Sequence, residues 1–154
     1  ARNNKMFRPQ PDPYKTCRPF NVDRCGVMLG EGAGIFVLER ADRARQRGAT
    51  IHARLRGYAT LADGYHPSSP EPEGRWEQRV MELAIENAKL PRGVDSVDAM
   101  IAHGTGTPQN RVTESRIFNE FAKLHGIEQW PVAAIKCYLG HALGAAAGDQ
   151  IATG

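Results

Sequence analysis

Aromatic residues and long apolar runs are scarce in this sequence, and each scarcity argues against a class of protein. Aromatic side chains make up only 7% of the 154 residues, and no nucleic-acid-binding motif accompanies the basic residues, so we expect no nucleic-acid partner. No apolar run approaches the roughly 20 residues that a transmembrane helix needs, so we expect no membrane association. The remaining composition, 41% hydrophobic and 24% charged, is ordinary for a globular domain.

Cysteine is also rare, and the three residues Cys17, Cys25 and Cys137 form no C-x-x-C pair. They cannot all pair with one another, which favours a reducing, cytoplasmic setting. The five histidines show neither i,i+4 spacing nor the Cys/His spacing of a zinc site. We therefore expect no metal centre.

Both ends of the sequence lack the features of natural chain termini. Ala1 takes the place of a start methionine, and no apolar signal core follows it. Residues 151–154 end inside an Ala-rich stretch that is expected to be helical. We therefore expect the polypeptide to continue beyond both ends.

Arginine supplies 15 of the 20 basic residues. Six arginines form a cluster in the first third of the sequence, namely Arg40, Arg43, Arg45, Arg47, Arg54 and Arg56. A patch of this kind can bind an acidic partner. Because Glu39 and Asp42 lie among the arginines, the interpretation that we favour is a solvated helix face.

The apolar pattern predicts an α/β fold. Strands are expected where apolar residues form short runs or alternate with polar ones, at 35–38, 50–58, 97–102 and 131–135. Helices are expected where apolar residues recur on one face or small residues dominate, at 41–47, 75–89, 112–124 and 141–152. The polar stretches at 1–18 and 59–74 are expected to be loops. From residue 50 onward the order is β-α-β-α-β-α, which is typical of a parallel sheet covered by helices.

Chemically active residues follow two of the expected strands. The strand 97–102 leads into His103-Gly-Thr-Gly-Thr-Pro108, and the strand 131–135 leads into Lys136 and then His141. Ligands collect at the carboxyl ends of strands in open parallel sheets. If the two strands are neighbours, His103, Lys136 and His141 converge on one crevice.

The chemistry of these residues favours oxyanion stabilisation. His141 is expected to open a helix, where the positive end of the helix dipole disfavours an imidazolium. A neutral ring then offers one N–H donor to a developing negative charge. The hydroxyls of Thr105 and Thr107 can bond amides of a ligand that approaches the small residues around them. Each histidine alone is more often structural, whereas two of them beside a lysine favour catalysis.

Four segments, in this order along the chain, resemble the motifs of β-ketoacyl synthases. They are Arg18-Pro-Phe20 with Gly30-Glu-Gly-Ala-Gly34, Gly57-Tyr58-Ala59-Thr60 with Tyr65-His66, His103-Gly-Thr-Gly-Thr-Pro108, and Lys136-x-x-x-Gly-His141. The residues from Pro108 to Glu114, together with Ile51-His52-Ala53, are most similar to those of type II polyketide ketosynthases.

The resemblance implies a thiolase-like layered α-β-α architecture that is incomplete in this chain. Residues 1–49 would correspond to the end of the N-terminal ketosynthase half, and residues 50–154 to part of the C-terminal half. It also implies a dimer, either a homodimer or a heterodimer of ketosynthase and chain-length factor.

The activity implied by the resemblance is an acyltransferase reaction of fatty acid or polyketide synthesis. An acyl thioester undergoes decarboxylative Claisen condensation with malonyl-acyl carrier protein. The substrates are carried on the phosphopantetheine group of the acyl carrier protein, and no further cofactor is implied. His103 and His141 would bond the malonyl thioester oxygen. Lys136 would pair with Glu114, while Thr105 and Thr107 would hold the phosphopantetheine arm.

Departures from the family pattern leave a second interpretation open. The nucleophilic cysteine of the family lies in an earlier half that this sequence lacks, so the chain alone is expected to be inactive. Cys137, beside Lys136, is interpreted as a packed thiol and not as a substitute nucleophile. The alternative is a catalytically silent subunit of the chain-length-factor type, which shapes the pocket. Intact His103, Lys136 and His141 favour the enzyme.

Overall fold

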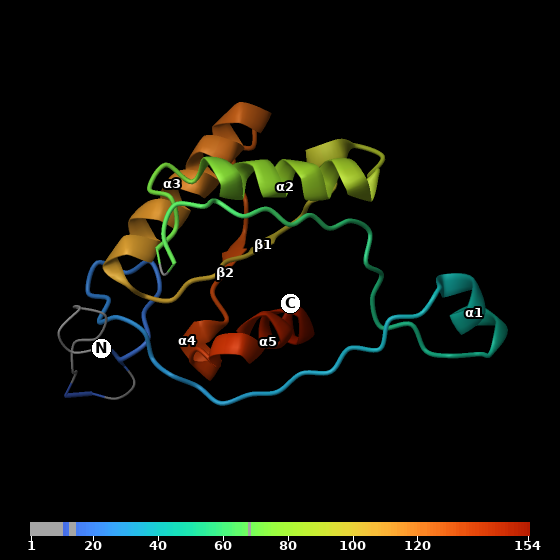
Figure 1. Cartoon of the computed structure of the whole chain (residues 1–154), viewed down its shortest axis with the longest axis horizontal. Helices are drawn as coiled ribbons and strands as arrows, with labels where there is room; N and C mark the ends of the chain where they lie inside the picture. The colour runs from blue at the N-terminus through green and yellow to red at the C-terminus, as the bar shows by residue number, and fades with distance from the viewer. Residues whose placement is uncertain (1–10, 13–14, 68) are drawn as a thin grey trace.

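The computed structural model describes residues 11–12, 15–67 and 69–154, so part of the loop expected at 1–18 lies outside the described residues. Helices dominate the described part, and its two short strands lie near the centre (Figure 1). Among these residues, no helix combines the length and the apolar character that a membrane crossing requires.

The centre of the molecule is a β-α-β unit. Strands β1 (Met100–Ile101) and β2 (Val132–Ala133) pair in parallel, with Met100 opposite Val132. The long helix α3 (Pro108–His125) connects them. Figure 1 shows α3 and α2 (Arg75–Ala88) on one side of the strand pair, and α4 (Lys136–Leu139) with α5 (Ala146–Thr153) on the other. The α/β class is therefore confirmed as mixed helices around a small parallel sheet.

Local capping explains where α3 begins and ends. The Thr107 hydroxyl accepts a hydrogen bond from the backbone N–H of Asn110 at 3.2 Å, and Pro108 occupies the first turn, where a missing N–H costs nothing. Gly126, with φ of 67°, ends the helix in the left-handed conformation that glycine tolerates. The helix therefore begins four residues before the predicted start at 112.

The core under α3 is small and partly aromatic. Phe121 is fully buried, and Ile117 and Ala102 are nearly so. Phe121 stacks on Trp130 with ring centroids 5.6 Å apart. Helix α2 approaches this core closely, because a Cβ on Gly74 would lie 2.2 Å from a side-chain carbon of Ile117.

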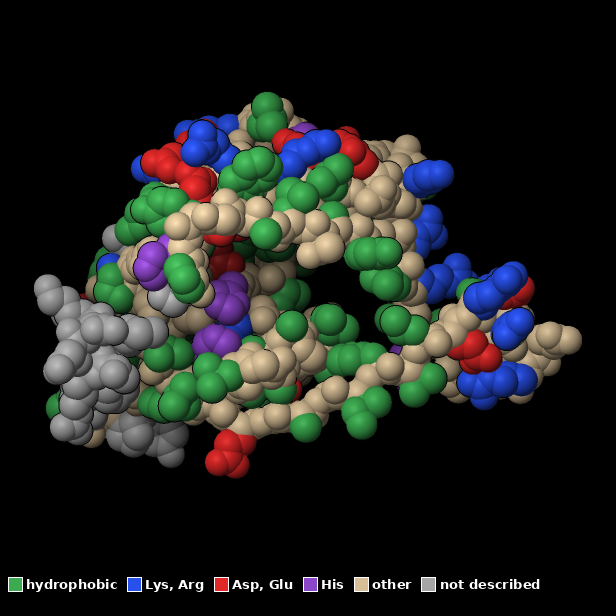
Figure 2. Space-filling view, viewed as in Figure 1, with side chains coloured by type: hydrophobic (Ala, Val, Ile, Leu, Met, Phe, Trp, Pro, Cys, Tyr) green, Lys and Arg blue, Asp and Glu red, His purple; other side chains and the backbone are tan. Residues whose placement is uncertain are grey.

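Two predicted strands are wrong for this chain. Residues 35–38 and 50–58 are extended but form no strand, and the side chain of Ile35 is 95% exposed. A strand requires a neighbour that satisfies its backbone and covers its side chains. Among the described residues no strand pairs with either segment. The Phe36 ring lies near Gly148, but Ile35, Val37 and Leu38 stay exposed. Figure 2 shows hydrophobic side chains in a row along the extended chain at the lower edge of the view.

Three further predicted elements are shorter or interrupted. Strands expected at 97–102 and 131–135 are reduced to two residues each. The helix expected at 141–152 is interrupted by a 3₁₀ turn, Leu143–Ala145, and α5 begins only at Ala146. Helix α2 matches its prediction to within one residue, and α1 (Ala41–Gln46) ends before Gly48, as expected.

The arginine cluster around α1 is a solvated surface, as favoured from the sequence. Arg40 forms an ion pair with Asp42 at 2.8 Å, and Arg47 forms one with Glu39 at 2.9 Å. All four residues are exposed, so these pairs contribute little to stability.

Candidate active site

The segments that follow β1 and β2 bring together the three residues predicted to converge. The ring centroids of His103 and His141 lie 5.3 Å apart, with the ring planes at 88°. The Nζ atom of Lys136 lies 3.4 Å from Nδ1 of His103. The predicted convergence is therefore present in the structure. Figure 2 shows histidine side chains gathered beside the hollow in this face of the molecule.

His141 is held by both its backbone and its ring. Its backbone N–H donates to the Met28 carbonyl at 2.7 Å, and its own carbonyl accepts from Gly30 at 3.1 Å. Its Nδ1 accepts from the Leu143 N–H at 3.1 Å. A neutral ring whose Nδ1 accepts a hydrogen bond carries its proton on Nε2. His141 is thus fixed as an Nε2–H donor.

The helix-dipole argument for a neutral His141 is not supported by the structure. The residue lies between α4 and the 3₁₀ turn, five residues before α5 begins, and the dipole acts within about one turn. The pKa of His141 is nevertheless lowered, first by partial burial and then by the charge of Lys136. The direction of this pKa shift agrees with the neutral ring expected from the sequence, but its cause is different.

His103 is also favoured in its neutral form. Partial burial is the largest cause of its lowered pKa, and the ammonium of Lys136 is the next. Glu114 acts in the opposite direction. Because an ammonium faces Nδ1, that nitrogen is the acceptor, and the proton resides on Nε2.

Lys136 is the buried charge of the site, with 3% of the residue exposed. Its ammonium donates to the backbone carbonyl of His103 at 2.7 Å and to Oε1 of Gln150 at 2.8 Å. Burial lowers the pKa of Lys136, and Glu114 is the strongest of the groups that oppose this shift. Among the described residues no carboxylate oxygen lies within 4.0 Å of Nζ. Lys136 and Glu114 therefore interact through space and not by direct contact.

Glu114 anchors the loop that carries His103. Its carboxylate accepts from the backbone N–H of His103 at 2.5 Å and of Gly104 at 2.9 Å, and from Nδ2 of Asn110 at 2.8 Å. It comes from the buried face of α3. This carboxylate thus fixes the position of His103 relative to the end of β1.

The two threonines of the loop lie side by side. Thr105 Oγ1 and Thr107 Oγ1 are 3.3 Å apart, and the Thr105 backbone N–H donates to Asn110 Oδ1 at 3.2 Å. Because the Thr107 hydroxyl already caps α3, its role toward a ligand stays a prediction.

Sequence reasoning missed Asn110 and Gln150. Asn110 bonds Thr105 and Glu114 at once. Gln150 links Lys136 to the Ala102 carbonyl, to which its Nε2 donates at 2.5 Å. Gln150 could have been noticed in the sequence, because it is a polar residue within the Ala-rich run that precedes Ile151.

The cysteines around Lys136 differ in their environments. Cys17 Sγ donates to the Lys136 carbonyl at 3.0 Å, and burial raises the pKa of its thiol. Cys137 is exposed, so its interpretation as a packed thiol is wrong for this chain, because no described segment covers it. Within the described part, no three side chains of His, Cys, Asp or Glu are grouped to hold a metal ion.

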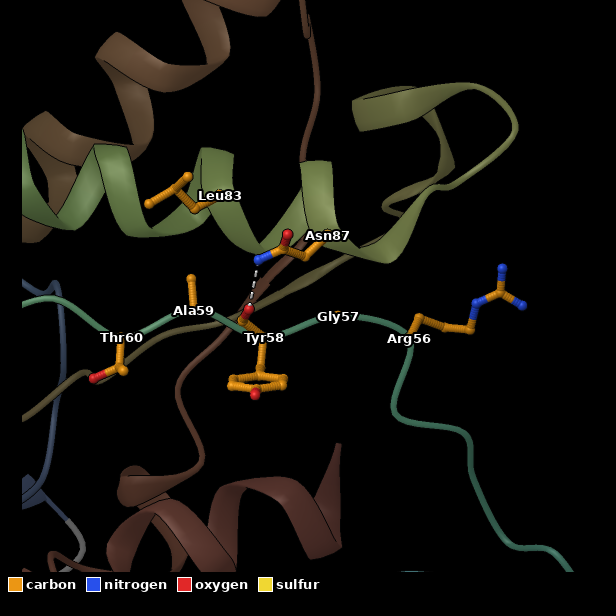
Figure 3. Close-up of a pocket in the computed structure, with 7 residues that line it drawn as sticks. All are labelled: Arg56, Gly57, Tyr58, Ala59, Thr60, Leu83 and Asn87. Atoms are coloured by element: carbon orange, nitrogen blue, oxygen red, sulfur yellow. Dashed lines mark hydrogen bonds between the residues drawn. The ribbon is translucent and has the colours of Figure 1, made fainter. Parts of the chain in front are cut away.

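A separate cavity of about 500 Å³ lies between residues 56–60 and α2 (Figure 3). The segment is fastened by Asn87, whose Nδ2 donates to the Tyr58 carbonyl at 3.1 Å. Gly57 permits this approach, since a Cβ there would lie 2.3 Å from the Ala84 carbonyl oxygen. None of the residues predicted for the active site lines this cavity.

Comparison with known proteins defines the class to which this arrangement belongs. Residues 52–153 match the family profile described as "Beta-ketoacyl synthase, C-terminal domain". Because the match covers more than half of the sequence, the chain belongs to the β-ketoacyl synthase family.

Individual relatives agree with this assignment. The chain is 38% identical over 143 residues to 3-oxoacyl-[acyl-carrier-protein] synthase 2 of Synechocystis sp. (strain ATCC 27184 / PCC 6803 / Kazusa), covering 92% of this chain and 34% of that protein. A ketosynthase complex with its type II polyketide acyl-carrier protein matches with a TM-score of 0.88 at 29% identity, over 98% of this chain and 37% of that one. The ishigamide ketosynthase/chain length factor matches with a TM-score of 0.79 at 38% identity, over 94% and 33%. The chain therefore spans about a third of the length of the relatives that it matches.

Proposed function

We propose that this chain supplies the histidine and lysine part of the active site of a β-ketoacyl-acyl carrier protein synthase. The reaction is the decarboxylative Claisen condensation of an acyl thioester with malonyl-acyl carrier protein, in fatty acid or polyketide synthesis. One observation carries the proposal. The imidazoles of His103 and His141, with ring centroids 5.3 Å apart, each have Nδ1 occupied, which leaves both Nε2 positions to donate toward a ligand.

The arrangement supports loss of CO2 from a malonyl thioester. In the proposed reaction the thioester oxygen accepts hydrogen bonds from Nε2 of His103 and of His141. As the bond to the carboxylate breaks, its electron pair forms an enolate, and the new negative charge resides on that oxygen. Donors already aimed at the charge stabilise it without reorganisation. The enolate carbon then attacks the acyl thioester carbon and expels a cysteine thiolate that lies outside this chain.

Lys136 contributes by keeping the donors neutral. An imidazolium at His103 would bring a second positive charge to within 3.4 Å of the ammonium, which is unfavourable in a partly buried site. Glu114 holds the loop of His103 in place and balances part of this charge. The two groups thus organise the charge and geometry of the site without a direct ion pair.

The proposed partners are those implied by the resemblance to the β-ketoacyl synthase family. Thr105 and Thr107 would receive the phosphopantetheine arm of an acyl carrier protein, and the complete enzyme would be a cytoplasmic homodimer or a heterodimer with a chain-length factor. Residues 1–49 would end its N-terminal half, and residues 50–154 would form part of its C-terminal half. Similar structures that contain a carrier protein or a chain-length factor support this choice of partners.

A catalytically silent, pocket-forming subunit is the second candidate. It is favoured by the similarity to a ketosynthase/chain length factor complex, whereas the ordered donors favour the enzyme.

The test uses the complete polypeptide, meaning these residues together with the segment that supplies the nucleophile position. CO2 release from carboxyl-labelled malonyl-acyl carrier protein, followed by a β-ketoacyl product, is expected of the enzyme. Failure to release CO2 in the presence of an acylated carrier protein would favour the silent subunit.

A further inference from the structure

The buried ammonium of Lys136 has a neutral partner where a counter-ion is expected. Buried charges in proteins are usually paired with an opposite charge. Among the described residues no carboxylate oxygen lies within 4.0 Å of this ammonium, and its side-chain acceptors are Oε1 of Gln150 at 2.8 Å and Nδ1 of His103 at 3.4 Å.

The Gln150 amide matches both of its neighbours. Its oxygen accepts from Lys136, and its nitrogen donates to the carbonyl of Ala102 at the end of β1. A carboxylate at position 150 would place a negative oxygen next to the carbonyl oxygen of Ala102. An apolar side chain there would bond neither Lys136 nor Ala102. The amide thus ties Lys136 to the residue directly before His103.

We propose that Gln150 is a positioning residue for the condensation, which directs the Lys136 ammonium at Nδ1 of His103 while leaving that ammonium without a counter-ion. This inference rests on the proposed function. Its consequence is that the charge of Lys136 acts on His103 undiminished, so His103 stays neutral and donates through Nε2.

The other titratable groups around Lys136 leave this role to Gln150. Glu114 from α3 already accepts three N–H groups, and Asp149 from α5 acts on Lys136 only through space. Cys17 has a raised pKa, which favours the neutral thiol, and this thiol bonds the backbone carbonyl of Lys136. His141 opposes the protonation of His103. A carboxylate at position 150 would therefore be the first negative charge in direct contact with the ammonium.

The decisive experiment is an NMR titration of the His103 imidazole in the complete polypeptide. Gln150→Glu is expected to raise the pKa of His103 by about one unit, because a negative charge near a histidine favours the imidazolium. Gln129→Glu is the matched control, since Gln129 is exposed and precedes β2, whereas Lys136 follows it. An unchanged His103 titration in folded Gln150→Glu would overturn the inference.

A second variant keeps the proposal testable if Gln150→Glu does not fold. Gln150→Met removes the acceptor without adding charge, so the ammonium is directed less well at Nδ1 of His103. The rate of malonyl decarboxylation is expected to fall about 10-fold, and the acidic limb of its pH profile should move to higher pH by less than in Gln150→Glu. In Gln150→Glu the raised pKa of His103 should move the acidic limb of the pH–rate profile to higher pH. A Gln150→Met variant with wild-type rate would count against the positioning role.

The two proposals can fail separately. If the wild-type polypeptide releases no CO2, the proposed function fails, but the NMR titration still reports how Gln150 acts on His103. If CO2 is released and neither variant differs from wild type, only the inference about Gln150 fails.

Discussion

The Nζ atom of Lys136 lies 3.4 Å from Nδ1 of His103, and the same ammonium donates to the His103 carbonyl at 2.7 Å. One buried charge thus fixes both the ring and the backbone of a candidate oxyanion donor. The ammonium disfavours protonation of the ring, and its position assigns the ring proton to Nε2.

The first prediction concerns pH. Burial and Lys136 lower the pKa of His103 from its usual 6.5. A histidine with a lowered pKa stays neutral to a lower pH, so decarboxylation by the complete enzyme should persist below pH 6.5 and fail only as the pH drops through the lowered value. Lys136→Met removes one cause of the shift and is expected to move this acidic limb to higher pH. Lys123→Met, an exposed lysine on α3, is the control in the same pH–rate measurement.

The second prediction separates the two chemical steps of the complete enzyme. His103→Ala or His141→Ala is expected to reduce malonyl decarboxylation by about 100- to 1,000-fold, the usual cost of losing one oxyanion donor. Acylation of the cysteine should change little, because both donors act on the malonyl oxygen. CO2 release and acyl-enzyme formation, measured by mass spectrometry, check the two steps, with exposed His52→Ala as the control. Normal decarboxylation by the variants would assign the histidines a structural role.

The third prediction concerns Glu114 and the His103 loop. Glu114→Ala leaves the backbone N–H groups of His103 and Gly104 without their acceptor. Hydrogen bonds to a charged group contribute about 1.5–3 kcal/mol each, so the loss is expected to lower the free energy of unfolding by about 3 kcal/mol. Denaturant unfolding of the complete enzyme measures this change. Glu120→Ala, on the exposed side of the same helix, should cost far less, and equal losses would contradict the anchoring role.

The convergence of three side chains was predictable from the sequence, whereas two of the four expected strands were not. His103, Lys136 and His141 could be placed together because each follows a strand of a β-α-β unit, and this unit is local in the sequence. Gln150 could not be assigned a role, because its contact with Lys136 depends on how α5 packs under the strands. The pairing of Lys136 with Glu114, implied by the family resemblance, takes the form of a through-space interaction.

Strand predictions failed where the partners are absent. The apolar run at 35–38 predicts a buried strand, but an apolar pattern indicates only that a segment is suited to burial. It does not say which segment covers it. Gly48 and Gly126, by contrast, end helices through their own backbone conformation, and these ends were predicted to within two residues.

The fourth prediction is that the 154-residue chain alone has no condensing activity. It contains oxyanion donors, but the nucleophile of the proposed reaction lies outside it. Incubation of the purified chain with acyl- and malonyl-acyl carrier protein, analysed by mass spectrometry, should yield no β-ketoacyl product. Turnover by this chain would contradict the proposal and direct attention to exposed Cys137.

The last prediction concerns the uncovered segment 35–38. Ile35 is 95% exposed and Val37 is 86% exposed, although burial of each side chain is worth about 1.5–3 kcal/mol. Such a surface favours association, so the chain expressed alone should aggregate.

Replacing both residues by lysine should therefore make the isolated chain more soluble. The same change should destabilise the complete enzyme, where we expect another segment to cover these side chains. Leu124→Lys is the control, because Leu124 is already 66% exposed on the well-formed helix α3, and it should affect neither protein strongly. Light scattering and thermal unfolding measure the two effects, and hydrogen exchange adds a direct check. Strong protection of amides 35–38 in a monodisperse monomer of the isolated chain would show that these residues need no further segment to cover them.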